Sequence, residues 1–232
     1  MKSRLWVYTE DTAEDAPEVL KTLVKRLLQQ LSPGLPTNLL KPLLLSAVPA
    51  AEATTAWGGH YWRKRYSPKR RALVSELATR VSTGDIVLLH HDYDAAPGKP
   101  STLSTQVAEL LSEVARIVPP EKWRGAILTL TPCYSVESWL YHNDGAIAGL
   151  SARERDAAQR WLRDNLHATL GYDHIYQPKK ACPLKADHNL TLATKAFPAD
   201  LAAARSPSWQ ATQTRLSTSP PLNALLAAIN PA

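Results

Sequence analysis

At its centre the sequence runs Ile86-Val87-Leu88-Leu89-His90-His91-Asp92-Tyr93-Asp94. The apolar part has the length and composition of a strand buried on both faces, as in a parallel sheet. The strand ends in two acids, Asp92 and Asp94. In open α/β sheets ligands bind beyond the carboxyl ends of the strands. This segment therefore predicts both a parallel sheet and the edge of that sheet at which a site would lie.

Two further apolar runs of strand length, at residues 5–9 and 126–130, flank this segment along the chain. Apolar residues at helical spacing predict helices over 20–31, 73–81 and 103–117. Further helices are expected from Ser135 and from Ser151, and a short helix and strand near 43–48. Asp15 with Glu18, and Ser151 with Glu154, have the spacing of capping boxes.

The alternation of strands and helices predicts an α/β fold with a Rossmann-like core, in which helices flank a mostly parallel sheet. We expect this core to span residues 1–145. A mainly helical C-terminal extension, residues 146–232, is expected to pack on the core.

The composition of the 232-residue chain excludes several classes of protein. No apolar stretch is long enough to cross a bilayer, and the acid at Glu10 comes too early for a signal peptide. Cys133 and Cys182 are too few for a disulfide framework or a four-cysteine zinc site, and both are expected to be buried. We therefore expect a cytoplasmic protein with no membrane partner.

The formal net charge of +6 comes from one short segment. Residues 1–62 carry six basic and six acidic side chains, and residues 72–232 carry fifteen of each. The excess lies in the basic segment, residues 63–71, whose cations are Arg63, Lys64, Arg65, Lys69, Arg70 and Arg71. Aromatic residues interleave with it at Trp57, Tyr61, Trp62 and Tyr66. Cations mixed with aromatic rings are typical of single-stranded nucleic-acid binding, although a solvated helix start is the simpler alternative.

Acidic residues follow each of the three predicted strands. They are Glu10 and Glu14 after the first strand, Asp92 and Asp94 after the second, and Glu137, with Ser135, after the third. Carboxylates gathered at one edge repel one another unless a cation lies between them, and these oxygen ligands suit Mg²⁺ or Mn²⁺. Each acid taken alone has a simpler explanation as a helix cap or a first-turn acid. His90 and His91 should point to opposite faces of the strand, so at most one would enter such a site.

The order E-x-x-x-E, D-x-D, S-x-E resembles the metal-binding core of TOPRIM proteins, and most closely OLD-family nucleases and small standalone RloB-like TOPRIM proteins of prokaryotic defence loci. The segment from Thr131 to Leu140 is similar to their P-x-x-x-x-E-x-W-L segment. The resemblance covers roughly residues 4–140, and the tail from Lys195 to Trp209 is similar to their ending. Asp11 stands where TOPRIM proteins often have glycine, and an ATPase is expected to be a separate chain and not a fused domain.

The resemblance implies a two-metal phosphodiester-cleaving site. Glu10 would activate water, and metal ligands would come from Glu10, Glu14, Asp92, Asp94, Ser135 and Glu137. A trailing lysine would stabilise the phosphate; the spacing favours Lys195, with Lys179, Lys180 and Lys185 as alternatives. These roles imply a metal-dependent nuclease of antiphage defence, with nucleic acid and a separately encoded ATPase as partners.

Two other functions are compatible with the sequence. A nucleotide-sugar glycosyltransferase also uses D-x-D after an apolar strand to hold Mn²⁺, although the acids crowded after the first strand disfavour it. A degenerate TOPRIM-like module could bind nucleic acid or an ATPase without catalysis.

Overall fold

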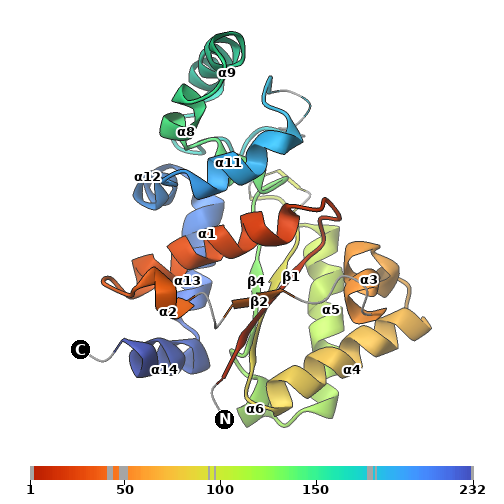
Figure 1. Cartoon of the computed structure of the whole chain (residues 1–232). Coiled ribbons are helices and arrows are strands. Elements are labelled where there is room, and N and C mark those ends of the chain that lie inside the picture. The colour runs from red at the N-terminus through yellow and green to blue at the C-terminus, as the bar shows by residue number, and fades with distance from the viewer. Residues whose placement is uncertain are drawn as a thin grey trace.

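The structure, a computed structural model, describes residues 3–40, 44–46, 52–93, 95–96, 98–176, 180 and 182–230. Its sheet consists of the strands β1 (Leu5–Thr9), β2 (Leu44–Ser46), β3 (Ile86–His90) and β4 (Ile127–Leu130). All neighbouring pairs are parallel, and the order across the sheet is β2-β1-β3-β4 (Figure 1). The predicted α/β fold with a parallel sheet is confirmed.

The sheet is covered by helices on both faces, which explains its apolar sequence. Every residue of β3 is buried. In β1, Leu5 and Val7 belong to the hydrophobic cluster on one face, whereas Trp6 and Tyr8 belong to the cluster on the other. Strands placed between two helical layers need apolar residues at every position, as predicted for residues 86–89.

Helices from the middle of the chain cover one face (Figure 1). They are α3 (Glu52–Gly58), the 3-10 helix η1 (Tyr61–Arg63), α4 (Pro68–Ser82), α5 (Thr102–Ile117) and α6 (Pro120–Trp123). α4 begins five residues before the predicted apolar stretch because Ser67 caps it, its hydroxyl accepting a hydrogen bond from the backbone N of Arg70. Pro68 then occupies the first turn, where no amide donor is required.

The other face carries α1 (Ala16–Leu31) together with helices from the C-terminal part of the chain (Figure 1). These are α11 (Asn189–Thr194), α12 (Ala199–Arg205), α13 (Pro207–Ser217) and α14 (Pro220–Ile229). The other helices in the described part of the chain are α2 (Thr37–Leu40), α7 (Glu137–Leu140), α8 (Asp144–Ala148), α9 (Ala152–Asn165) and η2 (Ala186–His188). Within the described ranges, none of the helices has the length and apolar character needed to cross a bilayer.

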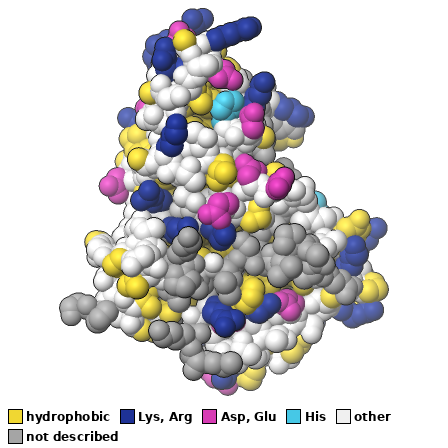
Figure 2. All heavy atoms as spheres, in the orientation of Figure 1, with side chains coloured by type: hydrophobic (Ala, Val, Ile, Leu, Met, Phe, Trp, Pro, Cys, Tyr) yellow, Lys and Arg dark blue, Asp and Glu magenta, His cyan; other side chains and the backbone are white. Residues whose placement is uncertain are grey.

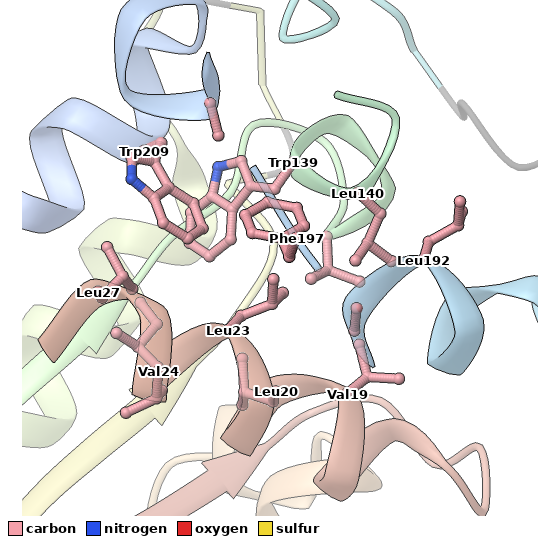
Figure 3. Packing of buried hydrophobic residues seen from close by; sticks show 14 of the residues in the cluster. Val19, Leu20, Leu23, Val24, Leu27, Trp139, Leu140, Leu192, Phe197 and Trp209 are labelled. Carbon is pink, nitrogen blue, oxygen red and sulfur yellow. The ribbon is translucent and has the colours of Figure 1, made fainter. Parts of the chain in front are cut away.

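Two tryptophans lie in the interface between α1 and the C-terminal helices (Figure 3). Trp209 of α13 is fully buried and packs edge-to-face on Trp139, with ring centroids 5.1 Å apart. Phe197 also packs on Trp209, with ring centroids 5.4 Å apart, and Nε1 of Trp209 donates to Gln30 Oε1 of α1 at 2.9 Å. One hydrophobic cluster thus contains residues from both sides of the expected boundary at residue 145.

The two expected capping boxes have different outcomes. Ser151 caps α9: its hydroxyl accepts from the backbone N of Glu154 and donates to that residue's carboxylate. Asp15 precedes α1 but makes no side-chain capping bond, because its backbone is already in the helical region. Glu18 pairs instead with Lys21 at 2.7 Å, so the capping box predicted at Asp15 is wrong.

Candidate functional site

A cavity of about 570 Å³ lies at the carboxyl ends of the strands. We call it the acidic cavity. Four of the residues predicted for the site line it: Glu10, Asp92, Ser135 and Glu137. Glu10 directly follows β1, Asp92 follows β3, and the last two follow β4. Since these strands are neighbours in the sheet, their ends deliver the side chains to one place.

Glu10 is tied to the neighbouring strand end and faces a histidine. Its Oε1 accepts a hydrogen bond from the backbone N of Asp92 at 2.5 Å. Its Oε2 lies 3.7 Å from Nδ1 of His60, and only 10% of the Glu10 side chain is exposed. The backbone that follows β3 therefore fixes the orientation of this carboxylate.

His60 reaches the cavity through an unusual stretch of backbone. It has a φ of 58°, and it follows Gly58 and Gly59 at the end of α3. A Cβ at Gly59 would lie 2.6 Å from the Tyr61 ring and 2.9 Å from the backbone O of Thr55, so the tight turn before His60 requires glycine at this position. No role for His60 was predicted from the sequence; the glycine pair before it is the signal that could have pointed to a tight turn here.

Glu137 is held by two hydrogen-bond donors at the bottom of the acidic cavity. It is 1% exposed; its Oε2 accepts from Ser135 Oγ at 2.5 Å and its Oε1 from Asn189 Nδ2 at 2.6 Å. Val136, and not Ser135, occupies the N-cap position of α7. The Ser135 hydroxyl therefore does not cap the helix and donates instead to the Glu137 carboxylate. Asn189, 52 residues further along the chain, was not predicted and carries no local signal.

The two histidines at the end of β3 point to different cavities, as predicted. His90 lines the acidic cavity, with its Nδ1 3.1 Å from Thr9 Oγ1 and its Nε2 3.7 Å from Asp92 Oδ1. His91 lines a second cavity. Burial lowers the pKa of His91 to about 4, so this side chain is neutral at pH 7.

The charge of the acidic cavity favours a cation. Four carboxylates line it, from Glu10, Asp11, Asp92 and Glu137, against the ammonium group of Lys180. Within the described part of the chain, no three His, Cys, Asp or Glu residues form a group that could hold a metal ion. The predicted ligand Asp94 lies outside that part. Carboxylates around one cavity are nevertheless the donor chemistry that suits Mg²⁺ or Mn²⁺.

Two predicted residues lie away from the acidic cavity. Glu14 is exposed on the loop before α1 and does not line it. Lys195 is exposed at the end of α11, with its Nζ next to Gly149. Lys180, one of the alternatives for the lysine, does line the cavity. Of these two lysines, Lys180 is therefore the better candidate for the residue that would stabilise the phosphate.

The basic segment divides into an exposed part and one buried arginine. Arg63, Lys64, Arg65 and Arg71 are exposed and Lys69 is half-buried, with its Nζ 3.8 Å from the centre of the Tyr61 ring. These five residues form what we call the basic surface. In Figure 2, Lys and Arg side chains gather at the right-hand edge, beside α3 and the start of α4, while acidic side chains gather over the start of α1.

Arg70 does not belong to the basic surface. It is 2% exposed, its Nη2 lies 2.7 Å from Glu113 Oε1, and its Nη1 donates to the backbone O of Trp62. The prediction of Arg70 as a nucleic-acid contact is wrong, because the guanidinium instead joins α4 to α5.

Two of the aromatic residues near the basic segment also have a structural role. Trp57 and Trp62 are fully buried and stack on each other, with ring centroids 5.0 Å apart. They cannot serve as platforms for bases. Tyr61 and Tyr66 are 44% and 81% exposed and remain available for stacking.

Comparison of the chain with protein-family models, curated proteins and solved structures finds no match. The assignment of a function therefore depends on the residues of the chain itself.

Proposed function

We propose that the protein is a divalent-metal-dependent nuclease with a TOPRIM-like core. The observation that supports this most directly is the convergence of Glu10, Asp92 and Glu137 from three neighbouring strand ends on one cavity. Their oxygens would hold Mg²⁺ or Mn²⁺. Asp94, two residues after Asp92 in the sequence, would be a further ligand. When bound, such a cation lowers the pKa of a water molecule and neutralises charge on a phosphoryl group. The resemblance to TOPRIM proteins adds an effector role in cytoplasmic antiphage defence, with a separately encoded ATPase as partner.

The residues of the chain divide the work of the proposed reaction among them. Glu10, oriented by the backbone N of Asp92, accepts the proton of the attacking water on Oε2. His60, 3.7 Å away and 41% exposed, passes that proton to solvent. Lys180 neutralises charge that develops on the phosphate. Ser135 and Asn189 hold the Glu137 carboxylate in one orientation.

The surroundings of the acidic cavity suit an unpaired nucleic-acid strand. Tyr134, which lines the cavity, packs edge-to-face on Tyr176, whose side chain is 63% exposed. Exposed aromatic rings offer stacking surfaces to unpaired bases. The basic surface supplies cations for the phosphates further along the strand.

The test of this function is metal-dependent cleavage. We expect the protein to cleave single-stranded DNA or RNA with Mg²⁺ or Mn²⁺ and to be inactive with EDTA. Asp92→Asn, at a carboxylate that is one-third exposed, should lower the rate at least about tenfold. The matched control is Asp156→Asn, at an exposed acid on α9, which should leave the rate unchanged.

Two other results would support the alternative functions. Turnover of a nucleotide sugar with Mn²⁺ and no cleavage would indicate a glycosyltransferase. Nucleic-acid binding unaffected by Asp92→Asn, with no cleavage under any metal condition, would indicate a non-catalytic binding module. Either result contradicts the nuclease proposal.

The basic surface predicts a salt-dependent affinity. In the variant Arg63→Gln/Lys64→Gln/Arg65→Gln we expect binding of single-stranded DNA to weaken about 10- to 100-fold at low salt. Each lost phosphate contact should reduce the slope of log K against log salt concentration by about 0.7. Fluorescence anisotropy at several salt concentrations measures both quantities.

The control for this experiment makes the same change in net charge elsewhere. Arg153→Gln/Arg160→Gln/Arg163→Gln removes three exposed cations from α9. This variant should keep the slope of the original protein. Equal losses in the two variants would show that net charge, and not the basic surface, governs binding.

A further inference from the structure

A second cavity, of about 530 Å³, lies along the outer edge of β4, which is the last strand of the sheet. We call it the β4 cavity. Val107 and Leu111 of α5 line one side, and Pro207 and Ala211 of α13 line the other. Its volume is in the range of small-molecule sites, which are largely apolar with a few polar groups. No role in the proposed nuclease reaction accounts for it.

The β4 cavity contains an arginine, and none of the described residues supplies it with a counter-ion. Arg215 of α13 reaches across the edge of β4, where its Nε donates to the backbone O of Thr129 at 3.3 Å. Its Nη2 donates to Thr131 Oγ1 and to Thr212 Oγ1. All of these acceptors are neutral, and the described residues include no carboxylate within ion-pair distance of the guanidinium. Burial lowers the pKa of Arg215, yet an arginine stays charged at neutral pH.

The other described polar groups of this cavity do not form an ion pair with Arg215. The carboxylate of Asp173 accepts hydrogen bonds from the hydroxyls of Ser206 and Ser208 and from the backbone N of Ser208. Burial raises the pKa of the Cys133 thiol to about 12, so this group is uncharged. His91 is neutral too; its Nδ1 faces the backbone O of Asp92, which can only accept, so Nδ1 carries the hydrogen.

We propose that the β4 cavity binds a small organic anion, with an apolar body between α5 and α13 and a single carboxylate or phosphate group on Arg215. An added peptide strand is a poorer fit, because Arg215 already occupies a carbonyl of the outer edge of β4. Covering the edge of a sheet with a helix, as α13 covers β4 here, is a common protection against such pairing. A planar guanidinium, by contrast, matches the oxygens of carboxylates and phosphates.

Three probes with the same alkyl chain test this proposal: octanoate and octyl phosphate, each below its micelle concentration, and octan-1-ol below its solubility limit. Titration calorimetry should show that at least one of the two anions binds at least tenfold more tightly than the alcohol, and comparison of the two identifies the preferred head group. In Arg215→Met, which keeps an apolar side chain, this preference should disappear. If octan-1-ol binds as tightly as both anions, or if neither anion binds at millimolar concentration, the proposal is wrong.

Two further variants locate the binding without touching Arg215. Ala108→Phe/Ala211→Phe fills the cavity from α5 and α13 and should abolish binding of all three probes. The variant Arg63→Gln/Lys64→Gln/Arg65→Gln should bind them unchanged. Unchanged binding in the filled variant, or loss of binding in the basic-surface variant, would place the anions elsewhere. Both results are independent of nuclease activity.

Discussion

Replacing Glu10 by Gln is expected to lower the rate of metal-dependent cleavage about 100- to 1000-fold, the range found when one group that stabilises transition-state charge is lost. Gln has nearly the same shape, and its amide oxygen can still accept the hydrogen bond from the backbone N of Asp92. What it loses is the negative charge that would hold a cation and accept a proton from water. The measurements are single-turnover cleavage at saturating Mg²⁺ or Mn²⁺ and the affinity for Mn²⁺ by calorimetry.

Glu14→Gln is the matched control, because it makes the same chemical change four residues further along the chain. Glu14 is exposed and does not line the acidic cavity, so we expect less than about a threefold change in rate, the size of a surface charge effect. The resemblance to TOPRIM proteins implies the opposite, since there both glutamates belong to the metal site. Equal losses in the two variants would mean that the geometry of the acidic cavity changes when metal binds.

The sequence predicts those parts of the fold and site that depend on neighbouring residues. The apolar run at 86–89 has to be buried on both faces, and the residues after a parallel strand have to emerge at its carboxyl edge. For this reason Glu10, Asp92 and Glu137 could be placed together without knowledge of the order of the strands. Successive side chains of a strand point to opposite faces of the sheet, and this alternation predicts the opposite orientations of His90 and His91.

Interactions between distant parts of the chain could not be predicted in this way. Arg70 lies among exposed cations in the sequence, and its burial depends on the carboxylate of Glu113 on α5, 43 residues away, together with the backbone O of Trp62. Asn189 is fixed near Glu137 by the packing of α11 on α1 and α7. In each case the deciding partner lies on another helix, and no periodicity in the sequence identifies it.

Removal of the Trp209 side chain is expected to lower the free energy of unfolding by about 4 kcal/mol, within the range for a buried aromatic residue replaced by alanine. Trp209→Ala leaves a cavity between Trp139 and Phe197 and removes the hydrogen bond to Gln30 (Figure 3). Because Gln30 belongs to α1 and Trp209 to α13, the substitution acts where the two parts of the chain meet. Urea denaturation followed by circular dichroism measures the loss.

The number of transitions in the urea unfolding curve tests whether the two parts of the chain unfold together. If residues 146–232 were a separate domain, Trp209→Ala would unfold that part first and produce two transitions. The shared hydrophobic cluster predicts instead one cooperative transition, shifted to lower urea concentration with an unchanged slope. Trp209→Phe is the control: it keeps an aromatic ring but loses the bond to Gln30, so it should cost only about 1–2 kcal/mol. A biphasic curve for Trp209→Ala, or equal losses in the two variants, would contradict a single core built across α1 and α13.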